Sequence, residues 1–410
     1  MDSKLLFSLI IGILIAQYLI DTFLDYLNSK KYREAIPEEL NDVFDEAEYQ
    51  KSQAYKKTNY RFGIANDAFS LLLTISFLLF GGFEWVDEIV RSFTTNPILM
   101  ALAFFGIIVI GSNIISIPFS YYQTFVIEEK FGFNKTTKKL FFIDLLKGLV
   151  MTTVLGGGLL ALVILFLQWT GDSFWLYAWG LFAILMLFIN LFYSKLIVPL
   201  FNKQTPLEAG SLKSSIESYA QKVGFELDNI FVIDGSKRST KANAYFSGFG
   251  KQKRVTLFDT LINDLNEEEI VAVLAHEVGH YKRKHIIFNL FATISLTGLT
   301  LFILSLFINN PELSLAIGVS NPSFHAVLVG FVLLYSPIST ITGLAMNFLS
   351  RKFEFQADDY AKETFAASPL ITSLKKLSKN SLSNLTPHPA YVFMHYSHPP
   401  LIQRIRNLKA

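Results

Sequence analysis

Seven long apolar segments constrain this chain more than any other feature of its sequence. Each is close to the roughly 20 residues that an α-helix needs to cross about 30 Å of hydrocarbon. Hydrophobic residues make up 51% of the 410 residues and charged residues only 17%, which argues against an ordinary soluble enzyme. The sequence therefore predicts an integral, multi-pass membrane protein surrounded by the lipid bilayer. The segments cover approximately residues 5–27, 62–83, 98–119, 145–166, 174–193, 286–308 and 324–349.

The connections between these segments alternate between rich and poor in Lys and Arg. Connections 29–61 and 123–140 carry seven and four, whereas 84–96 carries one and 309–323 carries none. By the positive-inside rule, this alternation predicts that the N-terminus lies outside. It places the two long water-soluble blocks, near residues 195–284 and from 351 onward, in the cytoplasm. The membrane is that of the endoplasmic reticulum or a bacterial inner membrane; the sequence does not choose between them.

The charge balance and the absence of cysteine narrow the function further. The 36 Lys and Arg residues and 34 Asp and Glu residues give a formal net charge of +2, so we expect no nucleic-acid partner. The chain has no cysteine, which excludes a thiol nucleophile, an iron–sulfur cluster and a thiolate zinc site. Any metal must therefore be held by His, Asp and Glu.

A metal-binding pattern follows a predicted helix start at Asn266, which caps a run of three glutamates. The pattern is H-E-x-x-H, formed by His276, Glu277 and His280. Residues four apart on an α-helix differ by only about 40° in projection, so both imidazoles can bind one ion. Glu277, about 100° round from His276, can act on a water at that ion. The apolar residues before the motif predict that this helix is buried.

A catalytic zinc needs three protein ligands and one open position, so one ligand must come from elsewhere. Glu354 is the best candidate. His280 lies six residues before the sixth apolar segment and Glu354 five residues after the seventh, so both lie roughly 8 to 9 Å beyond the membrane ends of their helices. Asp358, one turn after Glu354, is placed to accept a ring N–H from a ligating histidine. A solvated helix acid is the alternative interpretation of either carboxylate.

These motifs resemble, in order and over nearly the whole chain, those of the type I CAAX prenyl endopeptidases, which are integral-membrane zinc metalloproteases. The resemblance implies a mainly α fold in which seven transmembrane helices form a barrel around a water-filled chamber. A small α+β, zincin-like catalytic domain would close the cytoplasmic side. Members of this family cleave peptide bonds near the C-terminus of prenylated proteins. The residues that carry the resemblance are 276–280, 353–358, 243–250, 128–135 and 395–400.

The resemblance also assigns roles at the site. It makes Glu354 the third zinc ligand and Asp358 its supporting partner, with one Zn²⁺ per chain. It implies that the strand with Asn243, Ala244 and Tyr245 binds the substrate backbone. It further implies that two residues of the C-terminal tail line the active centre, namely His398 and Arg404. From the residues alone, a plain hairpin and a helix cap explain the strand and His398 equally well, and a solvated charge is the favoured interpretation of Arg404.

We accordingly expect four regions along the chain. Residues 1–200 carry transmembrane helices 1–5 with their cytoplasmic loops, and 201–285 form the catalytic domain with the H-E-x-x-H helix. Residues 286–350 carry helices 6 and 7, and 351–410 add the C-terminal helical part of the catalytic domain. Within the catalytic domain, strands are predicted at 230–233 and 254–258, the second closing a hairpin whose turn contains Gly248, Gly250 and Lys251.

Three other functions are compatible with parts of this sequence. A membrane quality-control metalloprotease uses the same chemistry on other substrates. A polytopic transporter explains the apolar segments, and a non-catalytic scaffold explains binding, but neither explains Glu277 beside two metal-ligating histidines.

The remaining histidines are assigned by position. His285, at a membrane edge, is expected to be interfacial, His325 to lie on the outer side, and His388 and His395 have no predicted role.

Overall fold

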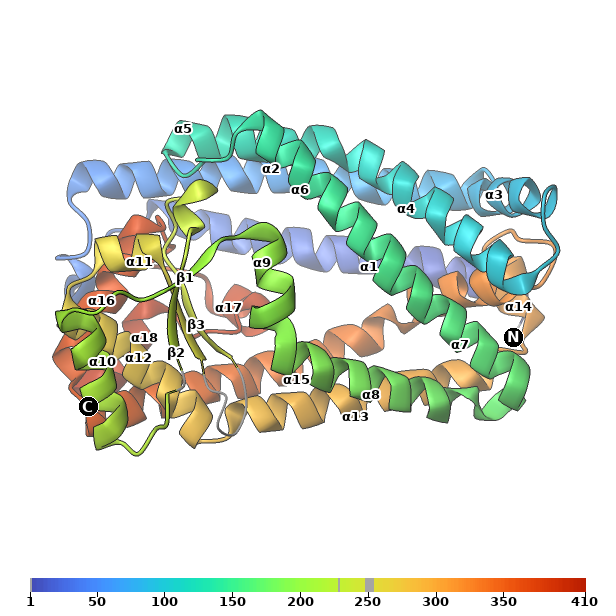
Figure 1. The fold of residues 1–410 in the computed structure, drawn as a ribbon. Helices are drawn as coiled ribbons and strands as arrows, with labels where there is room; N and C mark the ends of the chain where they lie inside the picture. The colour runs from blue at the N-terminus through green and yellow to red at the C-terminus, as the bar shows by residue number, and fades with distance from the viewer. Residues whose placement is uncertain (1, 228, 248–253) are drawn as a thin grey trace.

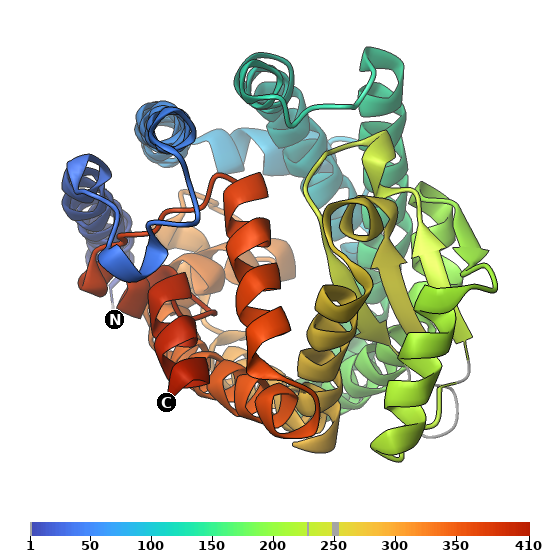
Figure 2. The same ribbon diagram turned by 90° about the vertical axis from the view of Figure 1, so that its left-hand side faces the viewer.

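The computed structural model describes residues 2–227, 229–247 and 254–410, and it is mainly helical with one small sheet (Figure 1). Within these residues, six helical stretches are long and apolar enough to cross a membrane. Figure 2 shows the long helices nearly end-on and arranged around the circumference of the molecule. The six stretches are Ser3–Lys30 (α1), Glu46–Leu79 (α2), Pro97–Phe131 (α4, η3 and α5), Lys138–Phe201 (α6 to α9), His285–Phe307 (α13) and Phe324–Thr364 (α15).

The stretch Lys138–Phe201 reverses direction once along its length. The chain turns back between α7 (Gly157–Thr170) and α8 (Phe174–Phe192), as Figure 1 shows. Gly171 makes this turn with φ 54° and ψ −130°, a conformation that essentially requires glycine. The one stretch therefore holds two of the seven apolar segments predicted from the sequence. The stretch is completed by α6 (Lys138–Met151), α9 (Val198–Phe201) and two π-helical turns, η4 (Thr152–Gly156) and η6 (Tyr193–Ile197).

The helix start predicted at Asn266 is confirmed, and a second capping box starts α2 at a position that the sequence analysis did not predict. Asn266 starts α12 (Glu267–Lys282) with a capping box, in which its side chain accepts from the Glu269 N–H and the Glu269 carboxylate accepts from the Asn266 N–H. Asp45 and Glu48 start α2 in the same way. These hydrogen bonds are local to the start of α12 and need no contact with another element.

The sheet has four strands in the order β1-β2-β4-β3. The central strands β2 (Asn229–Ile233) and β4 (Arg254–Phe258) pair in parallel, which confirms the two strands predicted from the sequence. β1 (Gln204–Pro206) pairs antiparallel with β2, and β3 (Ala244–Ser247) pairs antiparallel with β4. β1 was not predicted, because three residues that include a proline carry no strand pattern. The turn predicted at Gly248, Gly250 and Lys251 lies outside the described residues.

One apolar core joins the two water-soluble blocks. Ile230, Leu257 and Leu274 pack there with residues that follow the last long helix, including Leu370 and Leu408. The sheet and the helices that carry this core, α12, α16 and α18, lie at one end of the molecule, opposite α3, α14 and the N-terminus (Figure 1). The other helices are α3 (Gly82–Arg91), α5 (Glu129–Phe131), α10 (Ser211–Lys222), α11 (Asp259–Asp264), α14 (Pro311–Ala316), α16 (Ala367–Asn380), α17 (Pro389–His395) and α18 (Leu401–Lys409), with the short turns η1 (Lys31–Arg33), η2 (Glu38–Leu40), η3 (Gln123–Glu128), η5 (Gly171–Ser173) and η7 (Gly235–Lys237).

Packing between α8 and α13 makes a testable prediction. The Trp179 indole N–H donates to the Ile294 carbonyl over 2.8 Å, and a Cβ on Gly298 would lie 2.7 Å from the same indole nitrogen. Gly298→Ala should therefore destabilise the protein by about 1 to 3 kcal/mol, the usual cost of overpacking. Thermal unfolding in detergent measures this cost. Gly343→Ala is the control, because a Cβ there meets nothing within 4 Å; equal stability of the two variants would contradict the prediction.

Candidate metal centre

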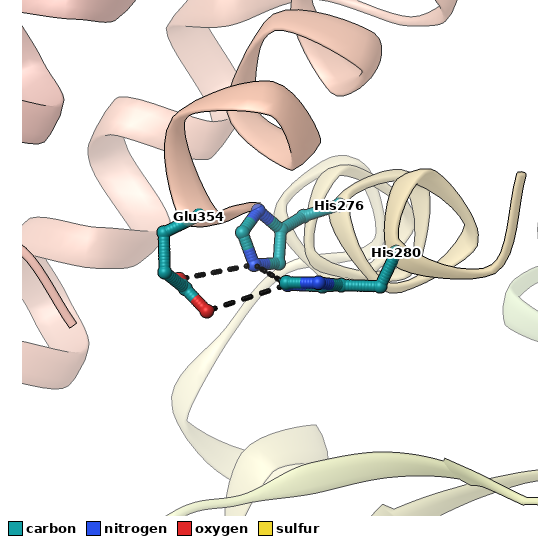
Figure 3. Close-up of side chains that lie close together, drawn as sticks. All are labelled: His276, His280 and Glu354. Atoms are coloured by element: carbon teal, nitrogen blue, oxygen red, sulfur yellow. Dashed lines mark hydrogen bonds and ion pairs between the residues drawn. The ribbon is translucent and has the colours of Figure 1, made fainter. Parts of the chain in front are cut away.

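Two helices that are distant in the sequence bring the predicted metal ligands together. α12 presents His276 and His280, and α15 presents Glu354 opposite them (Figure 3). The helices approach closely at Gly279, where a Cβ would lie 3.1 Å from both the Cα and the carbonyl oxygen of Ala357. The position between the two histidines must therefore remain without a side chain if α15 is to stay this close.

The three ligand groups converge on one point. His276 Nε2 lies 3.2 Å from His280 Nε2 and 3.5 Å from Glu354 Oε2, and His280 Nε2 lies 3.3 Å from Glu354 Oε1. Ligand atoms around a tetrahedral zinc with bonds of 2.0–2.1 Å are about 3.3 to 3.4 Å apart. The His276 and Glu354 side chains are only 9% and 5% exposed. The spacing and burial of these atoms fit a single zinc-sized ion.

A buried oxygen atom of Glu354 also fits a bound cation. Its Oε2 atom is buried and has no hydrogen-bond partner among the described residues, although Arg404 Nη1 lies 3.3 Å away. Buried carboxylate oxygens are almost always hydrogen-bonded or bound to a metal. The donor set of two imidazoles and one carboxylate is one that catalytic zinc sites use. These residues therefore fit zinc.

Asp358 and Arg404 support the first histidine. Asp358 Oδ1 lies 2.8 Å from His276 Nδ1, and Arg404 binds the Asp358 carboxylate through Nε at 2.9 Å and Nη2 at 2.6 Å. An Nδ1–H held by Asp358 leaves the Nε2 lone pair of His276 facing the other ligands. The predictions that Asp358 faces a ligating histidine and that Arg404 lines the centre agree with this geometry. A solvated Arg404 does not, since its side chain is only 11% exposed.

The charge state of His276 follows from these neighbours. Burial and the Arg404 guanidinium act to lower the pKa of His276, but the neighbouring Asp358 and Glu354 carboxylates outweigh them and raise that pKa to about 9. A proton therefore competes with a cation for this imidazole at neutral pH.

Glu277 stands at the centre without a structural partner. It is half-buried on α12, and in the part of the chain that the structure describes no hydrogen bond or ion pair involves its carboxylate. Burial acts to lower the pKa of Arg404, but the nearby carboxylates, Glu277 among them, outweigh burial and raise that pKa. Glu277 is thus close enough to the centre to interact electrostatically with Arg404.

The other predicted residues lie around this centre. His398 Nε2 is 3.3 Å from Glu354 Oε1, and the His398 side chain is 65% exposed. Asn243 is exposed at the start of β3, and its Oδ1 accepts from the Ala244 N–H over 2.8 Å. β3, which includes Ala244 and Tyr245, pairs within the described residues only with β4. The strand therefore keeps one free edge, and it packs next to α12.

The prediction that His285 is an interfacial residue is wrong. His285 is 3% exposed, its Nδ1 lies 3.0 Å from His280 Nδ1, and its Nε2 lies 2.8 Å from Gln356 Oε1. The sequence does contain a signal for this contact: His285 lies five residues after the ligand His280, and Gln356 lies two residues after Glu354. Sequence reasoning missed this pair because the turn between α12 and α13 could not be foreseen.

The remaining histidines make their contacts elsewhere in the described part of the chain. His325 lies 29 residues before Glu354 on α15, about 43 Å along the helix, and bonds to Asp87 Oδ1 over 2.7 Å. Its predicted position away from the site is thus confirmed. His388 caps α17 through Nδ1, and His395 Nε2 lies 3.8 Å from Asp21.

Known proteins match this chain along its length. Residues 25–203 match the family described as CAAX prenyl protease N-terminal, five membrane helices, and residues 206–410 match Peptidase family M48. The chain is 36% identical to the CAAX prenyl protease 1 homolog of Arabidopsis thaliana, over 97% of this chain and 96% of that protein. It is also 36% identical to CAAX prenyl protease 1 of Saccharomyces cerevisiae, over 98% of this chain and 94% of that protein. The crystal structure of S. mikatae Ste24p is similar, with a TM-score of 0.93, 33% identity and 99% coverage of both chains.

The close approach at Gly279 generates a prediction about metal binding. Gly279→Ala should push α12 away from α15 and lower zinc affinity about tenfold or more, the scale on which disturbed ligand geometry acts. Zinc affinity is measured by competition with a chelator of known affinity. Gly298→Ala, which disturbs packing far from the site, should leave zinc affinity unchanged. Wild-type affinity in the Gly279 variant would show that the helix spacing does not determine the site.

Proposed function

This chain belongs to the CAAX prenyl protease 1 family of M48 metallopeptidases, and from that premise we propose that it hydrolyses a peptide bond near the C-terminus of prenylated proteins. The single observation that carries the proposal is the convergence of His276, His280 and Glu354, whose ligand atoms lie within 4.8 Å of one another. Neither a transporter nor a non-catalytic scaffold requires such a centre beside a free glutamate.

His276, His280 and Glu354 would hold one Zn²⁺ per chain. When bound there, zinc lowers the pKa of a water molecule and polarises the scissile carbonyl. Glu277 takes a proton from the attacking water and passes it to the leaving amine, as a general base and then a general acid. Its carboxylate suits this role because it is half-buried and has no ion pair among the described residues.

His398 and Arg404 complete the centre in different ways. His398 reaches the ligand Glu354 while remaining exposed, so its imidazole is available to donate a hydrogen bond to the oxygen that becomes negative during the reaction. Arg404 is occupied by Asp358 and Glu354. It holds the two carboxylates in place and compensates their charge, which would otherwise be costly to bury.

The substrate backbone is proposed to bind along β3. An extended peptide can pair with the free edge of a strand through main-chain hydrogen bonds, which presents a scissile amide in a stretched form. Asn243 and Ala244 open this edge next to α12, and Tyr245 follows in register with Thr256 of β4. Main-chain pairing accepts many sequences, so selectivity for prenylated ends must come from elsewhere in the molecule.

The membrane arrangement is also a proposal. Seven crossings are supported by the six long apolar stretches together with the reversal at Gly171, and we propose that they form a barrel around a water-filled chamber. The zincin-like catalytic domain, residues 201–285 with 351–410, then faces the cytoplasm and the N-terminus faces outward. Residues 1–200 and 286–350 supply the membrane helices. The membrane is that of the endoplasmic reticulum or a bacterial inner membrane.

Substrate specificity is tested with paired peptides. Purified protein in detergent should cleave a prenylated peptide ending in a CAAX sequence, lose this activity to a chelator and regain it with zinc. The same peptide without the prenyl group should be cleaved much more slowly. Equal rates on both peptides would instead favour a quality-control metalloprotease.

The role of Glu277 is tested by Glu277→Gln. The amide keeps the shape of the side chain but cannot take the proton, so cleavage should fall about 10² to 10⁴-fold, the usual contribution of a general base. Zinc content should not change. Glu268→Gln, at an exposed position on the same helix, is the matched control and should retain full activity. Substantial activity in the Glu277 variant would remove it as the base.

The third ligand is tested by Glu354→Ala. Without this carboxylate only two imidazoles remain, so the zinc stoichiometry measured by elemental analysis should fall well below one per chain. Glu363→Ala, on the same helix with a side chain that is 64% exposed, should keep full stoichiometry. Unchanged metal content in the Glu354 variant would place the third ligand elsewhere.

A further inference from the structure

His280 uses both of its ring nitrogens. Its Nε2 faces the metal centre, 3.2 Å from His276 Nε2 and 3.3 Å from Glu354 Oε1. Its Nδ1 faces the opposite way and lies 3.0 Å from Nδ1 of His285. Two nitrogens at this distance share one hydrogen, so one ring must donate and the other must accept.

Gln356 decides which ring donates. His285 Nε2 lies 2.8 Å from the Gln356 Oε1 atom, and an amide oxygen can only accept a hydrogen bond. The hydrogen of a neutral His285 is therefore on Nε2, and its Nδ1 carries a lone pair. His280 must then donate from Nδ1. This leaves the lone pair of His280 on Nε2, which is the atom that faces the metal centre.

The surrounding structure holds His285 in this position. Its ring stacks on Phe353 with centroids 4.2 Å apart and planes 11° apart, and the residue is 3% exposed. Lys284 precedes it with φ 61°, an uncommon conformation for a residue other than glycine. That turn separates α12 from α13 and returns His285 beside His280. Sustained strain of this kind is typical of functional positions.

We propose that His285 and Gln356 are positioning residues that fix the tautomer and orientation of the metal ligand His280. They act through the chain His280 Nδ1–H to His285 Nδ1 and His285 Nε2–H to Gln356 Oε1. The two ligating histidines are thus supported differently, because a carboxylate, Asp358, holds His276 whereas a neutral relay holds His280. The inference rests on the proposed metal site but not on the proposed substrate.

The experiment measures zinc affinity of the full-length protein in detergent, by competition with a chelator and without any substrate. His285→Phe keeps a ring for stacking on Phe353 but removes the acceptor, and it should lower zinc affinity about 10 to 100-fold. His285→Gln restores an acceptor oxygen and should recover most of the loss. Glu363→Ala, at an exposed position on the same helix as Gln356, is the control and should keep wild-type affinity.

Either of two results would overturn the proposal: wild-type affinity in His285→Phe, or an equal loss in His285→Phe and His285→Gln. Thermal unfolding of the metal-free variants checks that they fold. If His285→Phe fails to fold, two variants of Gln356 test the proposal instead. Gln356→Glu keeps only acceptor atoms and should bind zinc nearly as wild type does, whereas Gln356→Leu should bind several-fold more weakly; equal affinities would refute the relay. Because no peptide is used, these results stand apart from the cleavage tests.

Discussion

The contact between α12 and α15 is the constraint on which the rest of the site depends. The two helices meet backbone to backbone at Gly279 and Ala357, and this spacing places the imidazoles of one helix within 3.5 Å of the carboxylate of the other. A metal centre tolerates displacements of only a few tenths of an ångström in its ligands. The absence of one Cβ between the two histidines is therefore as important to metal binding as the ligands themselves.

Charge burial explains why the C-terminal segment belongs to this centre. Glu354 and Asp358 are almost fully buried on α15, where unpaired carboxylates would cost several kcal/mol. Arg404, from α18, pairs with both and leaves Asp358 able to hold His276. The last helix thus neutralises and orients the ligands that two earlier helices supply. His398, on the approach to α18, is itself exposed, and its Nε2 lies 3.3 Å from Oε1 of Glu354.

Two long apolar helices extend directly to the metal centre. α15 is continuous from Phe324 to Thr364 and carries Glu354 in its last third, and α13 begins at His285, the residue beside His280. The position of the metal ligands is therefore defined by the packing of helices that are long and apolar enough to cross the membrane. This arrangement suits a membrane protease of the CAAX prenyl protease family, since a lipid-modified substrate lies in the bilayer while its peptide must reach a polar centre.

The sequence by itself determined the features that depend on spacing within one segment: the apolar segments, the pair His276 and His280, and the placement of Glu354 just after the last apolar segment. Helix geometry converts such spacings directly into positions. Only the tertiary structure decided which partners meet across segments. The pairing of Arg404, the parallel β2–β4 contact and the place of His285 depend on how separate elements pack, and for His285 on one turn at Lys284. No local pattern encodes such a contact, because its free energy arises between groups that only the folded chain brings together.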